Sequence, residues 1–214
     1  MKRCVIFCAG GFDGLLDPIR PDDHIIAADG GLSHVQALGL TPHTVLGDFD
    51  SLGYVPEAAT VFPVEKDDTD AMLAVRHGLS LGYRHFLLYG GLEGSRLDHT
   101  VANFQTLQFL ADRGAEGCLI GKDCIVTLLK NGTLRFPAGS SGILSLFCMG
   151  KDAKGVTLEG TKYPLQGGTL TAGFPLGVSN RLLGTKACVT VEDGSLLVIY
   201  PRQCGILWKT APKN

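Results

Sequence analysis

The sequence lacks the features that mark membrane-bound and nucleic-acid-binding proteins. Its 214 residues contain no apolar run long enough to cross a bilayer and no block of like charges. With 19 Lys and Arg against 21 Asp and Glu, the net charge of -2 disfavours nucleic acid or a membrane surface as a partner. The opening "MKRCVIFCAGG" runs into glycines without a cleavage pattern, so we expect no targeting signal and a cytoplasmic protein.

Paired cysteine ligands are missing as well. None of the seven cysteines belongs to a C-x-x-C pair, and most lie within apolar runs. Zinc sites built on cysteine need such spacings, and disulfide frameworks use an even number of cysteines in secreted chains. We therefore expect free, mostly buried thiols in a reducing compartment.

Three common nucleotide-binding patterns are also absent. The chain has no Walker A sequence and no H-R-D or D-F-G motif, and the early "GGFDG" matches G-x-G-x-x-G poorly. These absences argue against a P-loop kinase, a protein kinase and a dinucleotide oxidoreductase.

Two regions of different periodicity are present instead. Up to about residue 125, short apolar runs such as "HIIAADGG" alternate with two segments of helical spacing, 68–82 and 97–114, which predicts an α/β domain with a mainly parallel sheet. From about 126 to 214 the helical period disappears and brief strands follow one another, which predicts a small all-β sandwich or barrel. Asn131 and Gly132 in the second region predict a hairpin turn.

Polar clusters follow four apolar runs of the first region. Ligands of open α/β sheets bind beyond the carboxyl ends of the strands, so we expect these clusters to converge on one edge. Each has an ordinary alternative: a turn for the first, helix capping for Asp68 and Asp70, and a tight connection for the glycines. The clusters are Asp29-Gly30-Gly31, residues 47–51, residues 66–70 and residues 90–99.

Turns and caps do not account for the number of aspartates at this edge. Asp48 and Asp50 point the same way in extended backbone, and such crowding needs a cation or solvent to offset the repulsion. Oxygen ligands suit Mg²⁺, while Arg96 and Lys66 supply positive charge for phosphate groups. The pattern favours phosphoryl or nucleotidyl transfer. The crowded residues are Asp48, Asp50, Asp67, Asp68, Asp70 and Asp98.

Five motifs in order closely resemble those of thiamine pyrophosphokinases: "ADGG" (28–31), "GDFDS" (47–51), "KDDTD" (66–70), "GGLEGSRLDH" (90–99) and "GVSN" (177–180). The resemblance covers nearly the whole chain. It implies an α/β domain at 1–125 that binds ATP and Mg²⁺, and a β-sandwich domain at 126–214 that binds thiamine and dimerises. It also implies a homodimer with active sites between subunits. The implied reaction moves pyrophosphate from ATP to the hydroxyethyl oxygen of thiamine and releases AMP.

The resemblance also implies residue roles. The acidic set for the metal would be Asp48, Asp50, Asp70 and Asp98. Asp70 and Asp98 would be catalytic, and which of them is the base stays open. The residues that bind ATP or thiamine would be Asp29, Gly30, Lys66, Gly90, Gly91, Gly94, Arg96, Ser179 and Asn180.

Two other functions remain open from the sequence. One is another Mg²⁺-dependent nucleotidyl or pyrophosphoryl transferase with a different alcohol as acceptor. The other is a non-enzymatic regulator that binds thiamine or a nucleotide, against which the intact set of aspartates argues. His99 could assist proton transfer, but its position after Asp98 favours a helix-cap or core role.

Overall fold

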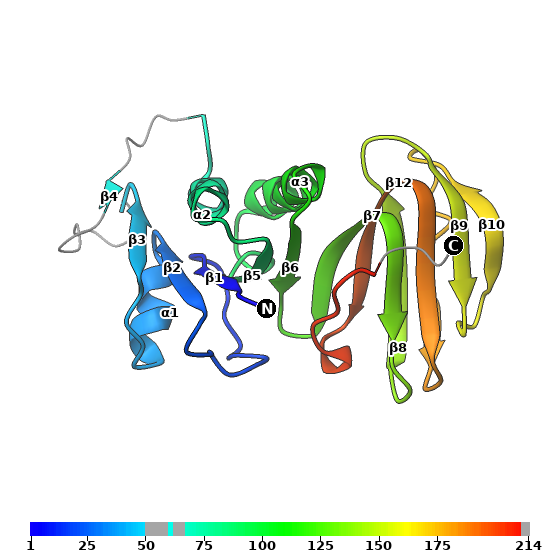
Figure 1. Cartoon of the computed structure of the whole chain (residues 1–214), viewed down its shortest axis with the longest axis horizontal. Helices are drawn as coiled ribbons and strands as arrows, with labels where there is room; N and C mark the ends of the chain where they lie inside the picture. Colours follow the sequence, from blue (N-terminus) through cyan, green and yellow to red (C-terminus); the bar gives the residue numbers. More distant parts are fainter. Residues whose placement is uncertain (50–59, 62–66, 211–214) are drawn as a thin grey trace. The chain divides into compact units, whose positions relative to one another are not determined.

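The computed structural model describes residues 1–49, 60–61 and 67–210. Asp50, Ser51 and Lys66 of the sequence motifs therefore lie outside the described residues. The chain divides into two compact units, Met1–Lys122 and Asp123–Asn214, which are coloured from blue to green and from green to red in Figure 1.

The first unit is built on a sheet whose described strand pairs are all parallel. Its strands are short apolar runs, and every residue of β1 is buried, as expected for a sheet that is covered on both faces. The spatial order is β6-β5-β1-β2-β3-β4. The bounds are β1 Cys4–Phe7, β2 His24–Ala28, β3 Thr44–Gly47, β4 Thr60–Val61, β5 His85–Tyr89 and β6 Glu116–Ile120.

Three helices of the described residues connect these strands: α1 Gly31–Ala37, α2 Asp70–Ser80 and α3 Leu97–Asp112. Figure 1 shows α2 and α3 on one face of the sheet and α1 on the other. The two predicted helical segments are confirmed by α2 and α3. α2 begins where Thr69 accepts a hydrogen bond from the Met72 N–H at 3.2 Å. In the part of the chain that the structure describes, no helix is long and apolar enough to cross a membrane.

The order of the strands locates a ligand crevice. The chain moves outward from β1 to β4 and then returns to place β5 on the other side of β1. The order in which strands are added therefore reverses between the carboxyl ends of β1 and β5. Open α/β sheets bind ligands at this switch point.

The second unit is antiparallel in all its described strand pairs. β12 pairs with β7, β8 and β9, so it is the central strand of this unit. None of the seven cysteines, all within the described residues, forms a disulfide bond, and five of them are buried, as the sequence predicts. The bounds are β7 Cys124–Phe136, β8 Ser141–Cys148, β9 Ala153–Glu159, β10 Leu165–Leu170, β11 Asn180–Leu183 and β12 Ala187–Pro201, followed by a 3-10 helix at Arg202–Cys204.

The predicted hairpin turn at Asn131 and Gly132 is wrong. β7 continues through both residues and stays paired with β12 on either side of them. Asn131 has a φ of 44°, and its side-chain oxygen accepts the Gly194 N–H at 3.0 Å, opposite a register shift in β12 between Val191 and Ser195. Asn131 and Gly132 thus lie at an irregularity in the pairing of two long strands and not in a hairpin turn. The reason is that β7 continues to pair with β12 beyond both residues.

Three histidines cluster at the amino-terminal ends of β2 and β3. The rings of His24 and His43 stack with centroids 4.8 Å apart, and His77 of α2 lies 6.4 Å from His24. The hydroxyl of Thr44 is 3.3 Å from Nε2 of both His24 and His77. Burial, and then the charges of His43 and His77, lower the pKa of His24.

Acid is expected to destabilise the fold through this cluster. The folded-state pKa of His24 lies below its unfolded value of about 6.5, so the unfolded chain binds more protons below that pH. The resulting stability is complete above about pH 6.5 and is lost as the pH falls toward the lowered pKa. Besides the two histidines, His24 meets the stacked ring of Tyr83 and, in register on β1, Cys4.

Urea unfolding at pH 7.5, 6.5 and 5.5 measures this effect. The variant His77→Gln removes one repelling charge and should lose less free energy of unfolding than the wild type over this range. The control His99→Gln changes an exposed histidine outside the cluster and should follow the wild type. Equal pH dependence in all three proteins would contradict the assignment.

Candidate active site

A pocket of about 920 Å³ opens in the first unit. Its lining comes from the segments that follow β1, β2, β3 and β5 and from the first turns of α2 and α3. The volume lies within the range of small-molecule sites, and the position is the switch point of the sheet.

Three aspartates form a compact carboxylate cluster in this pocket. One carboxylate oxygen from each of Asp29, Asp48 and Asp70 lies within 4.8 Å of the other two. Asp29 follows β2 and is buried, Asp48 follows β3, and Asp70 is the first residue of α2. Like charges this close repel unless a cation lies between them, and an all-oxygen set suits a hard divalent cation.

The backbone is specialised at two of the turns that carry these carboxylates. Asp29 has a φ of 49° and Phe49 a φ of 59°, a region that few residues other than glycine adopt. The turn at Asp29 is fixed by a hydrogen bond from its N–H to the Leu46 carbonyl at 2.8 Å. The turn at Phe49 is fixed by burial of its side chain, which is 2% exposed. A Cβ on Gly47 would lie 3.0 Å from Asp29 Cα. Such strain concentrates at functional sites, where the surrounding structure holds it in place.

Glycines from two loops form another part of the pocket. The Gly10 N–H donates to the Gly90 carbonyl at 3.0 Å, and the Gly11 N–H donates to the Glu93 carbonyl at 2.7 Å. A Cβ on Gly10 would overlap the Glu93 carbonyl oxygen, and a Cβ on Gly90 would overlap that of Cys8. The loops after β1 and β5 therefore pack backbone against backbone. Glycines in such loops let a phosphate approach the main chain closely.

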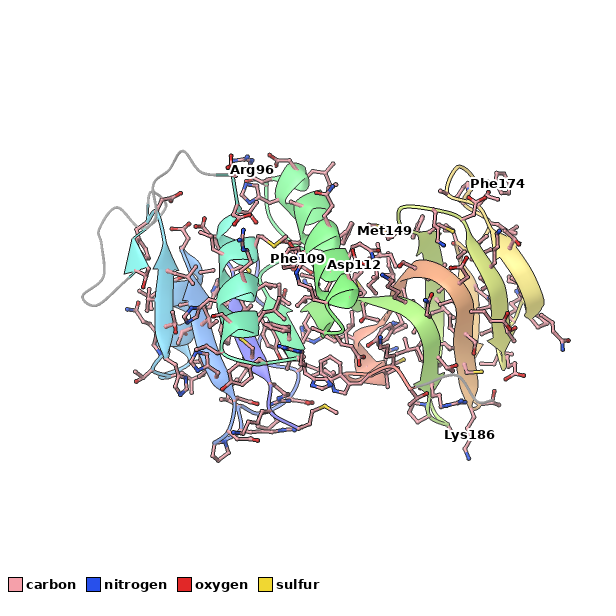
Figure 2. The ribbon with its side chains drawn as sticks, turned by 45° about the horizontal axis from the view of Figure 1, so that its top comes forward. Arg96, Phe109, Asp112, Met149, Phe174 and Lys186 are labelled. Atoms are coloured by element: carbon pink, nitrogen blue, oxygen red, sulfur yellow. The ribbon has the colours of Figure 1, made fainter. Side chains whose placement is uncertain are left out.

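Arg96 stands at the beginning of α3, as Figure 2 shows, and lines the pocket. Its guanidinium donates three hydrogen bonds to Asp98 at 2.6 to 3.2 Å. These bonds lower the pKa of Asp98 to about 2. Asp98 is 62% exposed and is not among the residues that line the pocket. A carboxylate with so low a pKa is a weak proton acceptor at neutral pH.

Two side chains from the first turns of α3 donate hydrogen bonds to the glycine loop that follows β5. The Asn103 side chain is buried and donates to the Gly91 carbonyl at 2.8 Å, and the Thr100 hydroxyl donates to the Leu92 carbonyl at 3.2 Å. His99 lies in the first turn of α3, is exposed and lines the pocket. Of the two expected roles, the core role is therefore wrong, and the helix-cap role stays a prediction.

Ser179 and Asn180 belong to the second unit. Ser179 has a φ of 62°, and its N–H donates to the Ser145 hydroxyl at 3.1 Å. The buried Asn180 side chain accepts from the N–H groups of Tyr163 and Arg181 at 3.0 and 2.7 Å and donates to the Tyr163 carbonyl at 2.8 Å. Its amide is thus used to shape its own unit.

The structure brings together most of the residues that the sequence assigned to the first domain. Asp98 and Gly30 are not part of the pocket lining, and Asp50 and Lys66 lie outside the described residues. The sequence assigned no role to Gly10, Gly11, Thr100 and Asn103, and only a backbone role to Glu93. Gly10 and Gly11 follow the first apolar run and could have been found by that position. The predicted residues that share the pocket are Asp29, Asp48, Asp70, Gly90, Gly91, Gly94 and Arg96.

The fold and the pocket define a class of protein. Carboxylates that suit a hard cation, together with glycines and an arginine that suit phosphates, are typical of enzymes that transfer phosphate groups. Their position at the switch point of a parallel sheet is typical of nucleotide sites.

Two family models match the sequence. "Thiamin pyrophosphokinase, catalytic domain" matches residues 18–119, and "Thiamin pyrophosphokinase, vitamin B1 binding domain" matches residues 133–196. The chain belongs to the thiamine pyrophosphokinase family.

Individual relatives agree with this membership. A thiamine pyrophosphokinase of Bacillus subtilis (strain 168) is 29% identical over 92% of this chain and 98% of its own length. The crystal structure of thiamine pyrophosphokinase from Bacillus subtilis has a TM-score of 0.79 at 25% identity and covers 94% of this chain and 99% of that chain. The structure from Geobacillus thermodenitrificans has a TM-score of 0.75 at 26% identity, with coverages of 94% and 97%.

Proposed function

We propose that the protein transfers pyrophosphate from ATP to the hydroxyethyl oxygen of thiamine, which yields thiamine diphosphate and AMP. The observation that carries the proposal is the carboxylate cluster of Asp29, Asp48 and Asp70 in one pocket with Arg96 and the glycine loops, within a chain of this family. A match to a vitamin B1 binding domain disfavours a different acceptor alcohol. The full carboxylate set disfavours a regulator without catalysis.

Mg²⁺ fits the carboxylate cluster, because each of the three aspartates offers an oxygen at short range. When bound, the ion would neutralise charge on the transferred and leaving phosphates. Asp29 thus joins Asp48 and Asp70 as a proposed ligand. Asp50 keeps its proposed ligand role from its motif alone. Asp98 is proposed to orient Arg96, to which it is bound.

The remaining steps are assigned to side chains of the chain itself. The thiamine hydroxyl attacks the β-phosphorus of ATP, its proton passes to a carboxylate, and the bond from the β-phosphorus to the α,β-bridging oxygen breaks. Of the two catalytic candidates, Asp70 is the proposed acceptor because the hydrogen bonds from Arg96 lower the pKa of Asp98 and make its carboxylate a weak base. Arg96 and the backbone at Gly90, Gly91 and Gly94 are proposed to bind the phosphates, and Lys66 to support them. Asp29 and Gly30 would shape the adjoining turn.

The second unit is proposed to be the β-sandwich that binds thiamine through the Ser179 and Asn180 segment, and the first unit the parallel α/β domain that binds ATP. Apolar side chains gather on the segment before Ser179: Phe174 is 64% exposed, Leu176 59% and Val178 39%. Figure 2 shows Phe174 at the edge of this unit, on the connection between β10 and β11. We propose that a second copy covers part of this surface in a cytoplasmic homodimer with active sites at the subunit interface.

Product analysis tests the reaction. The protein incubated with ATP, Mg²⁺ and thiamine should form AMP and thiamine diphosphate in equal amounts. ATP labelled at both the β and γ phosphorus should deliver both labels to thiamine. Formation of ADP and thiamine monophosphate would reject pyrophosphoryl transfer, and no thiamine-dependent loss of ATP would reject the enzymatic proposal.

Two substitutions should separate the two substrates. Arg96→Ala is expected to weaken binding of a non-hydrolysable ATP analogue by about ten- to a hundredfold, because it removes a charged donor to phosphate, and to leave thiamine binding unchanged. Ser179→Ala should weaken thiamine binding and spare the ATP analogue. Calorimetric titration of each ligand measures both effects. Equal losses for the same ligand in both variants would contradict the division.

A further inference from the structure

We infer that Glu93 is a positioning residue that fixes the glycine loops after β1 and β5, here called the glycine wall of the pocket. Glu93 thereby sets the affinity of the pocket for ATP. The inference rests on the proposed function, because it takes ATP as the ligand of this pocket. Glu93 lies within the loop that follows β5 and lines the pocket. It is not part of the compact cluster of Asp29, Asp48 and Asp70.

Glu93 bonds to the segments that follow two other strands. Its side-chain Oε1 accepts the backbone N–H of Lys122, just beyond β6, at 2.6 Å. Its own carbonyl accepts the N–H of Gly11, beyond β1, at 2.7 Å. β6, β5 and β1 are neighbours in the sheet, so one residue ties together the carboxyl-end loops of three adjacent strands. The Lys122 bond has a charged acceptor, which makes it stronger than a neutral one.

The glycine loop after β1 packs directly on this residue. A Cβ on Gly11 would lie 3.0 Å from the Cβ of Glu93 and 3.1 Å from its Oε2. A Cβ on Gly10 would overlap the Glu93 carbonyl oxygen. The place of the Gly10 and Gly11 backbone therefore depends on where Glu93 is held, and the Lys122 N–H is the group that holds its side chain.

Loss of the Glu93 side chain should disturb the glycine wall and leave the β-sheet intact. β5 is held by parallel pairing to β1 and β6 over buried residues, and none of those contacts uses Glu93. The thiamine-binding segment is proposed in the other unit. The expected result is weaker ATP binding with nearly unchanged turnover and folding.

Kinetics and hydrogen exchange of Glu93→Ala and Glu93→Gln test the inference, with Glu192→Ala in the second unit as a matched control for removal of a carboxylate. Glu93→Ala should raise KM for ATP about tenfold, with kcat and KM for thiamine within about twofold of the wild type. Glu93→Gln keeps an acceptor oxygen for the Lys122 N–H and should restore most of the affinity. In Glu93→Ala without ligand, the amides of Lys122 and Gly11 should exchange faster.

An unchanged KM for ATP in Glu93→Ala would overturn the inference, and so would a Gln variant as impaired as the Ala variant. Unchanged exchange at Lys122 and Gly11 would overturn it as well, and this readout needs no ATP. If the wild type fails to bind a non-hydrolysable ATP analogue with Mg²⁺, the proposed function fails, and exchange still decides whether Glu93 holds the wall.

Discussion

Asp70→Asn is expected to lower turnover by about a hundredfold or more while the protein stays folded. The Asp70 carboxylate is one of three whose oxygens lie within 4.8 Å of one another. A neutral amide is a poorer ligand for a hard cation and a far weaker proton acceptor, so both proposed roles are lost together. Removing one of three like charges also relieves repulsion, so the melting temperature without metal should stay the same or rise.

Asp68→Asn is the matched control for this experiment. Asp68 also lines the pocket, but its carboxylate pairs with Arg76 at 2.6 Å on the surface, where such pairs contribute little. Its turnover should stay within about twofold of the wild type. Turnover measured against Mg²⁺ concentration, together with thermal melting, gives both quantities. Near wild-type turnover in Asp70→Asn, or equal losses of turnover in both variants, would contradict the proposal that the carboxylate cluster binds the cation.

Gly90→Ala is expected to destabilise the fold by about 2–4 kcal/mol, a large part of the stability of a typical domain. Gly90 has a φ of 70°, which costs a residue with a side chain, and the added Cβ would overlap the carbonyl oxygen of Cys8. The neighbouring atoms are backbone and cannot turn away as a flexible side chain could. Urea unfolding measures the loss, and a variant within about 0.5 kcal/mol of the wild type would contradict the packing of the two loops.

Gly94→Ala separates packing from ligand binding in the same loop. A Cβ at Gly94 would lie an ordinary 3.8 Å from Gly10 Cα. Its stability should therefore stay within about 0.5 kcal/mol of the wild type. If the main chain at Gly94 approaches phosphate as proposed, binding of a non-hydrolysable ATP analogue should weaken. Unchanged binding would remove Gly94 from the proposed phosphate contacts.

The sequence predicts the two longer helices of the first unit, α2 and α3, but not the short helix α1. α2 and α3 follow from apolar residues at helical spacing, and α2 also has a capping threonine at Thr69. α1 has seven residues and no side-chain cap, so its sequence reads as a turn. Asn131 and Gly132 were misread because a turn signal reports backbone preference, whereas the pairing of β7 with β12 is set by contacts distant in sequence.

The site was predictable to the extent that it depends on strand order. Residues after the strands meet at one edge in any parallel sheet, which is why Asp48, Asp70 and Arg96 share a pocket. Proximity within that edge was not predictable. Asp29 belongs to the carboxylate cluster, and it lies on a turn with a positive φ, which its sequence does not announce. Asp98 lies outside the cluster, and its side chain accepts hydrogen bonds from Arg96 instead.

Anomalous diffraction from crystals grown with Mn²⁺ and a non-hydrolysable ATP analogue tests the central claim, that the carboxylate cluster holds the cation of the phosphate site. We expect a manganese peak within about 2–2.3 Å of carboxylate oxygens of Asp29, Asp48 and Asp70, with the analogue in the same pocket. Manganese bound only elsewhere, at Asp98 for example, with the three carboxylates free of metal and analogue, would contradict it.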